Sequence, residues 1–267
     1  MVRGISHLGA VSEVAGAWDA GGHVWVDLSL SEDRFFIDAV LRVNATPPYE
    51  EMALRLGDAL HNFRSALDSL AWSLCHLDGV SPKRPRSIYF PCVTEEDKWP
   101  EASRDLSSMP GDFLERIRLV QPFAAGAEGS PLRLLVELSN QDKHRGMVSA
   151  RASASNLRVG VHTGGAAGTR NGITNGMRME MLHPGGALVD GKPFARIETS
   201  VPVDLLHFRE PVGLEYVVET AAQDYALGDV QRGLIEIQRL MIFVCEGFWP
   251  DSTVIQPSIT LRRADGT

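Results

Sequence analysis

A regular apolar stripe at about residues 48–77 constrains the fold more than any other feature of the sequence. Large apolar side chains recur there with alternating spacings of four and three, which is the repeat of an α-helix with one buried face. Pro48, Glu50 and Glu51 are typical of a helix start, because proline fits the first turn and acidic side chains oppose the helix dipole. The stripe consists of Leu56, Leu60, Phe63, Leu67, Leu70, Leu74 and Leu77. The sequence therefore predicts one helix of about 45 Å that other elements must cover.

Three further helices are predicted downstream. A short one is expected at 111–120, and a second at 131–143 is apolar on nearly every side, which predicts that it is buried. A last helix at about 229–247 has heptad-like apolar spacing. We expect it to pack on the long helix at a shallow angle, as helices do in small bundles.

Extended segments occupy the rest of the chain. Alternating apolar residues at 23–30 and 34–44 predict an N-terminal β-hairpin, and 147–220 also has extended character. The candidate strands in that later region are 148–162, 177–182, 195–203 and 212–219, with a glycine-rich loop between the first two. Residues 1–21 are rich in glycine and alanine with weak patterning, and we expect them to be loosely ordered.

Strands and helices are segregated along the chain rather than alternating, which favours an α+β fold over a doubly wound one. The prediction is a small bundle of long amphipathic helices with an antiparallel β portion. No linker composition divides the chain, so a single domain over residues 1–267 is expected.

The charge and cysteine content narrow the class of protein. The net charge of −8 argues against a non-specific nucleic-acid coat protein, although a local basic site is compatible with it. The three cysteines, Cys75, Cys92 and Cys245, are scattered and indicate reduced thiols. The sequence contains no apolar run of about 18 residues and makes a poor signal peptide at its start, which predicts a cytoplasmic protein without a membrane span.

No cofactor or metal is expected. Residues 186–192 imitate a phosphate-binding loop, but Pro193 stands where that loop needs serine or threonine. A helical pair of metal ligands is also missing, because Ser65 rather than histidine or aspartate follows His61 by four residues.

A polar cluster on the long helix is the first candidate site. His61, Arg64 and Asp68 fall on one strip that flanks the leucine stripe, together with Trp72 and Cys75. Because tryptophan and cysteine are uncommon on open surfaces, we expect another segment to cover the strip. In a structural interpretation Arg64 pairs with Asp68 and His61 caps the end. In a functional interpretation His61 performs acid–base chemistry and Arg64 holds a phosphate or another anion.

The second cluster is Asn140, Asp142, Lys143, His144 and Arg145, at the end of the buried helix. Cations stabilise a helix C-terminus, which gives a structural interpretation. The alternative is functional, because acid, base and phosphate-binding groups occur together, and cationic neighbours favour the neutral, basic form of the His144 imidazole.

The two clusters carry a resemblance. The sequence HNFRSALD at 61–68, Phe-Pro at 90–91, Gln-Pro at 121–122 and NQDKHR at 140–145 resemble the motifs of a family of uncharacterised bacterial proteins. The similarity covers about residues 46–147.

More remotely, these helices are similar to HEPN domains. Many HEPN domains are metal-independent ribonucleases of toxin or phage-defence systems and usually act as dimers, so the resemblance implies RNA as a partner and a homodimer. Arg55 and His61 match the spacing of the Arg-x4–6-His signature of that group.

Two hypotheses follow for function. In the first, the protein is a HEPN-like ribonuclease or binds a phosphate-bearing ligand: His61 or His144 deprotonates a ribose hydroxyl, and Arg64, Lys143 and Arg145 stabilise the phosphate. The residues predicted to converge in this pocket are His61, Arg64, Asp68, Asn140, Asp142, Lys143, His144 and Arg145. In the second, the protein is a non-catalytic binding or scaffold protein whose polar cluster is structural.

Overall fold

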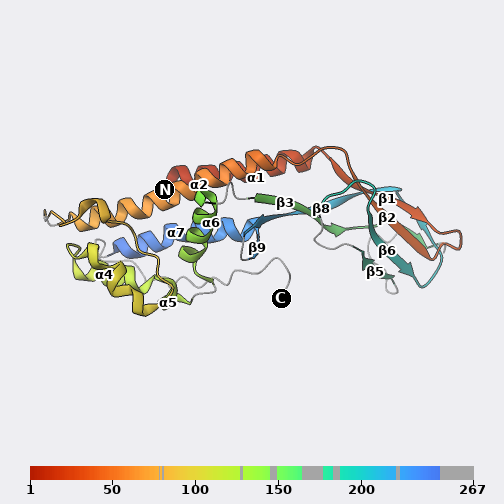
Figure 1. Ribbon diagram of the computed structural model, residues 1–267. Helices are drawn as coiled ribbons and strands as arrows, with labels where there is room; N and C mark the ends of the chain where they lie inside the picture. The colour runs from red at the N-terminus through yellow and green to blue at the C-terminus, as the bar shows by residue number, and fades with distance from the viewer. Residues whose placement is uncertain are drawn as a thin grey trace. The chain divides into compact units, whose positions relative to one another are not determined.

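The structure is a computed structural model whose chain forms two compact units (Figure 1). The residues that it describes are 1–77, 79, 81–126, 129–144, 149–163, 177–182, 187–220 and 223–246. The first unit comprises Met1–Val11, Glu50–Ser149 and Val218–Thr267, and the second comprises Ser12–Tyr49 and Ala150–Val217. The single domain expected from the sequence stays a prediction.

The long helix is α2, Tyr49–Cys75, within two residues of the predicted bounds. Leu56, Leu60, Phe63, Leu67 and Leu74 of the predicted stripe are all buried. Leu77, which lies past the last helical turn, is partly exposed. Leu70 is only partly buried, so the alternation of four and three marks the buried face of α2 correctly at five of its seven positions.

The N-terminal segment corrects a prediction, because residues 1–21 are not loosely ordered. They form helix α1, Val2–Ala20, and its first-unit part buries Leu8 and Val11. Gly4 allows this helix to approach α2 closely, since a Cβ built on Gly4 would lie only 3.0 Å from the ring of Phe63. Small residues at such a contact leave little apolar periodicity in the sequence, although they favour close packing.

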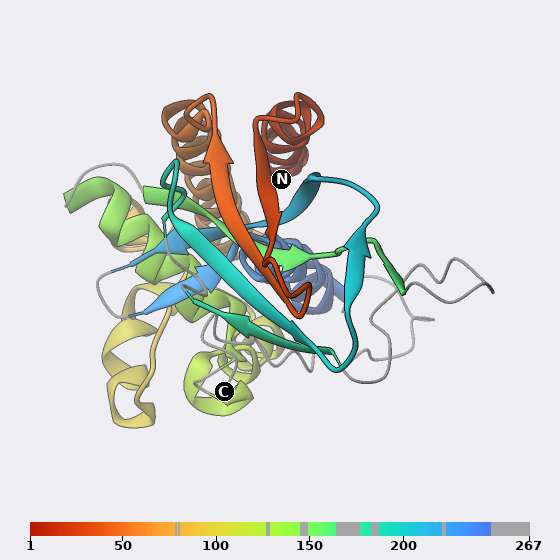
Figure 2. The same cartoon turned by 90° about the vertical axis from the view of Figure 1, so that its right-hand side faces the viewer.

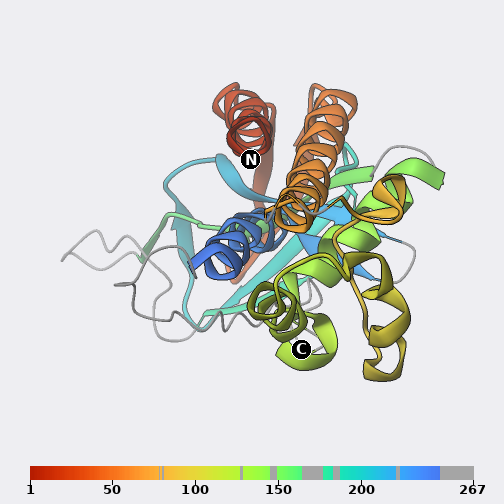
Figure 3. The same cartoon turned by 90° about the vertical axis from the view of Figure 1, so that its left-hand side faces the viewer.

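The other helices of the first unit are α3 Trp99–Ala102, α4 Gly111–Leu119, α5 Pro122–Ala125, α6 Pro131–His144 and α7 Leu227–Cys245. Helices α4, α6 and α7 lie near their predicted positions, whereas the short helices α3 and α5 were not predicted. Helix α7 packs most extensively against α6 and α4 (Figure 3). Its shallow pairing with α2, and a bundle of long helices, therefore remain predictions. Among the described residues, no helix combines the length and the apolar character that crossing a bilayer requires.

The second unit is built on an antiparallel sheet that curls into a half-barrel, with strand order β3-β8-β1-β2-β6-β5 (Figure 2). The predicted hairpin is confirmed as β1, Val24–Leu30, and β2, Phe36–Val43. The other strands are β3 Ser149–Leu157, β4 Val161–Thr163, β5 Met177–Met181, β6 Pro193–Thr199, β7 Val203–Leu205 and β8 Arg209–Glu219. The short strand β9, Asp224–Ala226, belongs to the first unit. Two predicted strands are divided, because 148–162 contains β3 and β4 and 195–203 contains parts of β6 and β7. Strands β4 and β7 form a separate pair.

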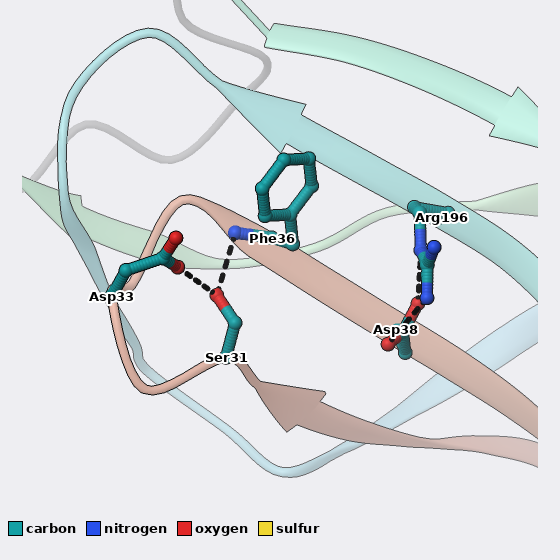
Figure 4. A network of polar contacts seen from close by, with 5 residues as sticks. All are labelled: Ser31, Asp33, Phe36, Asp38 and Arg196. Carbon is teal, nitrogen blue, oxygen red and sulfur yellow. Dashed lines mark hydrogen bonds and ion pairs between the residues drawn. The ribbon is translucent and has the colours of Figure 1, made fainter.

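The hairpin turn is fixed by local hydrogen bonds (Figure 4). The Ser31 hydroxyl donates to Asp33 at 2.6 Å and accepts from the backbone N–H of Phe36 at 3.0 Å. Further along β2, Arg196 of β6 donates twice to Asp38, at 2.6 and 3.1 Å. Turn chemistry and cross-strand charge together set the register of these strands.

Candidate functional site

Arg64 and Asp68 on α2 form an ion pair that is directed at one residue of the loop after the helix. Arg64 Nε and Nη2 lie 3.2 and 3.1 Å from the carboxylate oxygens of Asp68. Arg64 also donates to the carbonyl oxygen of Phe90 at 3.0 Å, and Asp68 accepts from the backbone N–H of Phe90 at 2.9 Å. The pair thus satisfies both backbone polar groups of Phe90 and fixes this loop to α2.

The local sequence accounts for this arrangement. A spacing of four places Arg64 and Asp68 on neighbouring turns of the same strip. The Phe90 side chain is buried, which brings its backbone to the helix surface. The ion pair of the structural interpretation is confirmed, and so is the expectation that a segment covers this part of the strip.

The cover does not extend to Trp72, which corrects the expectation for that residue. Its side chain is 49% exposed, and its ring stacks on His76 with a centroid distance of 3.9 Å. Cys75, one turn further on, is buried.

Helix α6 meets α2 at Gly57. A Cβ built on Gly57 would lie 3.1 Å from Oδ1 of Asp142, so the glycine leaves room for this carboxylate beside α2. His61 follows Gly57 by one turn, is exposed, and has no hydrogen bond or ion pair with the residues that the structure describes. The predicted capping role of His61 is therefore not found. Asp142 thus lies one turn before the strip. The convergence of the α6 residues with His61, Arg64 and Asp68 stays a prediction.

The structure does not bring all of the remaining predicted site residues to Gly57. Asn140 is exposed and lies about 160° around α6 from Asp142, so the two side chains leave the helix in different directions. Lys143 and His144 occupy the last turn of α6, where their side chains are outside the described part, and Arg145 lies outside the described residues.

A second polar network, which the sequence analysis missed, holds α6 in place. Glu137 accepts from the hydroxyl of Thr220 at 2.8 Å and from the Tyr225 hydroxyl at 3.1 Å. Gln141 donates to the carbonyl oxygen of Glu219 at 2.9 Å. Burial raises the pKa of Tyr225, which keeps its hydroxyl protonated as a donor. The sequence signal for this network is a charged residue, Glu137, within an otherwise apolar stretch of the helix.

Cys92, two residues after Phe90, lies close enough to Arg64 to feel its charge. Burial raises the pKa of the Cys92 thiol to about 11, although the Arg64 charge opposes the shift. A thiol with a raised pKa stabilises the fold fully below its unfolded pKa, and this contribution is lost as pH rises towards its folded pKa.

We therefore expect stability to fall between about pH 9 and about pH 11, with Cys92 contributing about 2 kcal/mol of the loss. Urea unfolding of the wild type and Cys92→Ala across this range measures the contribution. The variant should lose less stability with pH than the wild type. Equal losses would contradict the assignment, because the other buried thiols and phenols are common to both proteins.

No group of three histidine, cysteine or acidic side chains among the described residues is arranged to hold a metal ion. Comparisons of the chain with protein-family models, with curated proteins and with solved structures find no match in any of the three.

Proposed function

We propose that the protein is a non-catalytic binding or scaffold protein in which the α2 cluster has a structural role. The observation that supports this is the double contact of Arg64 and Asp68 with the backbone of Phe90. The guanidinium and the carboxylate neutralise each other, and both are directed at a peptide segment of the same chain. Arg64 is thus poorly placed to hold a phosphate.

The position of Asp142 supports the same proposal. Its carboxylate lies against α2 at Gly57, close to where the ribonuclease hypothesis needs an anionic phosphate. Negative charge at that point opposes the approach of a phosphate. Asn140, which would complete the pocket, leaves α6 on another side.

A matched pair of substitutions on α2 tests the structural role. Arg64→Ala should lower the free energy of unfolding by about 2 kcal/mol, because it leaves the half-buried Asp68 carboxylate and the Phe90 carbonyl without their partner. His61→Ala, on the same strip but exposed, should change it by less than about 0.5 kcal/mol. Urea titration gives both values, and equal effects would contradict the proposal.

A second experiment tests for ribonuclease activity. RNA is incubated in EDTA with the wild type, with His61→Ala and with His144→Ala, and its cleavage is measured. A scaffold protein should leave RNA of varied sequence and structure intact in all three samples. Cleavage by the wild type that either substitution abolishes would overturn the proposal.

One observation favours a second candidate, a bacterial HEPN-like ribonuclease or anion-binding protein. Asp142 of the second motif lies against Gly57, one helical turn before the exposed His61 of the first motif. In this proposal His61 serves as acid or base for a phosphate-bearing substrate. A thermal-shift screen with nucleotides would reveal such a ligand even where catalysis is absent.

A further inference from the structure

Strand β5, Met177–Met181, forms one edge of the half-barrel. Within the part of the chain that the structure describes, β6 is the one strand paired with it. The two charged side chains of β5, Arg178 and Glu180, are exposed. Its three methionines are half-buried and pack against the apolar core of the sheet. An edge of this kind presents backbone groups that can pair with another strand.

The hydrogen-bond pattern shows which backbone groups point outward. Leu182, just past the strand, donates its N–H to the carbonyl oxygen of Phe194 in β6 at 2.9 Å. In an antiparallel pair, alternate residues direct both backbone groups at the partner strand. Glu180 and Arg178 therefore bond towards β6. The N–H and C=O groups of Met177, Met179 and Met181 point away from it.

We propose that this edge pairs antiparallel with the same edge of a second copy of the chain, about a two-fold axis at Met179. In that register the outward groups of Met179 face those of Met179 in the second copy, and Met177 faces Met181. Arg178 then lies directly opposite Glu180 of the second copy, on both sides of the axis. The strand MRMEM is thus complementary to itself in shape and charge.

The neighbouring registers are unfavourable. A two-fold axis at Arg178 or at Glu180 would also align outward backbone groups. Each of these registers sets like charges directly opposite each other, Arg178 against Arg178 or Glu180 against Glu180. Cross-strand like charges are destabilising, so charge selects the register centred on Met179.

The proposed contact extends a row of charges that already crosses the sheet. Asp38 of β2 pairs with Arg196 of β6 (Figure 4), and Arg196 lies opposite Glu180 of β5. The second copy would add Arg178 and then Glu198, which is opposite Arg178 in the same sheet. Charges alternate in sign along the whole row. This argues for a second copy as the occupant of the edge, and it does not depend on the role of the α2 cluster.

Sedimentation velocity over a range of protein concentrations tests the proposal by charge reversal. The wild type should associate into dimers, whereas R178E and E180R should each remain monomeric, because each sets like charges opposite each other in the homodimer. An equal mixture of R178E and E180R should dimerise again, since both cross-strand pairs are then opposite in sign. Two variants that had simply lost their fold could not form a dimer when mixed, so restoration would separate the proposed contact from a general loss of folding.

A backbone substitution provides the second arm. Met179→Pro removes an N–H that points away from β6, so pairing within the sheet keeps its hydrogen bonds while the dimer loses two at its centre. Circular dichroism should show a folded protein, and sedimentation should show a monomer. A wild type that stays monomeric would overturn the proposal, and so would a dimer that tolerates R178E, E180R and Met179→Pro.

Discussion

Replacement of Gln121 by alanine is expected to lower the free energy of unfolding by about 3 kcal/mol. The Gln121 side chain is 0% exposed and both ends of its amide are bonded. Its oxygen accepts from the backbone N–H of Val93 at 2.9 Å, and its nitrogen donates to the carbonyl oxygen of Ile117 at 2.9 Å. The substitution leaves two buried backbone groups without partners and opens a cavity, and both effects act in the same direction.

Asn140→Ala is the matched control for this prediction, because it removes an exposed amide from another helix of the same unit. It should change stability by less than about 0.5 kcal/mol. Urea titration followed by circular dichroism compares the two variants. If Gln121→Ala lowered the free energy of unfolding no more than Asn140→Ala, the segment around Val93 would not depend on the Gln121 amide.

The expected loss at Gln121 illustrates what the sequence could not show. The residue stands just before Pro122, and its position indicates a helix boundary, but its partner Val93 lies 28 positions earlier in the chain. Local patterns carry no information on a contact of that kind. The same holds for Phe90, which lies 26 positions from Arg64.

Contacts within one helix were predictable. The buried face of α2 follows from apolar spacing, and the Arg64–Asp68 pair follows from a separation of four residues. Helix geometry also predicts that Asn140 and Asp142, two residues apart, leave α6 in different directions. This rotation opposes the predicted convergence of all eight polar side chains, because Asn140 and Asp142 cannot both point towards the same part of α2.

Helix α1 was missed for a different physical reason. Its contact with α2 uses Gly4 as a point of close approach, and glycine in a sequence indicates weak helix propensity rather than packing. Gly4, Leu8, Val11 and Ala15 are buried at spacings of four and three, but two of these four positions are small residues that give little hydrophobic signal in the sequence. The strands are divided at 158–160 and 200–202, where Gly160 and Pro202 are turn signals to which the predicted strands gave no weight.

Phe63→Ala is expected to have the largest effect on the helical unit, a loss of about 4 kcal/mol in the free energy of unfolding. Phe63 is 0% exposed at the centre of the buried face of α2. Its ring is also the surface on which α1 rests at Gly4. Alanine therefore removes apolar burial from α2 and leaves a cavity beneath α1. Because other contacts also hold α1, this helix can move to fill the cavity only in part.

Leu54→Ala is the control on the same helix, since Leu54 is 58% exposed and alanine has equal or better helix propensity. It should change stability by less than about 0.5 kcal/mol, as measured by urea titration. Hydrogen exchange adds a local test. The amides of α1 should exchange faster than in the wild type in Phe63→Ala, and at the wild-type rate in Leu54→Ala. A Phe63→Ala protein with wild-type exchange in α1 would show that this helix does not depend on the Phe63 ring. Its helical state would then rest on the contacts of Leu8 and Val11.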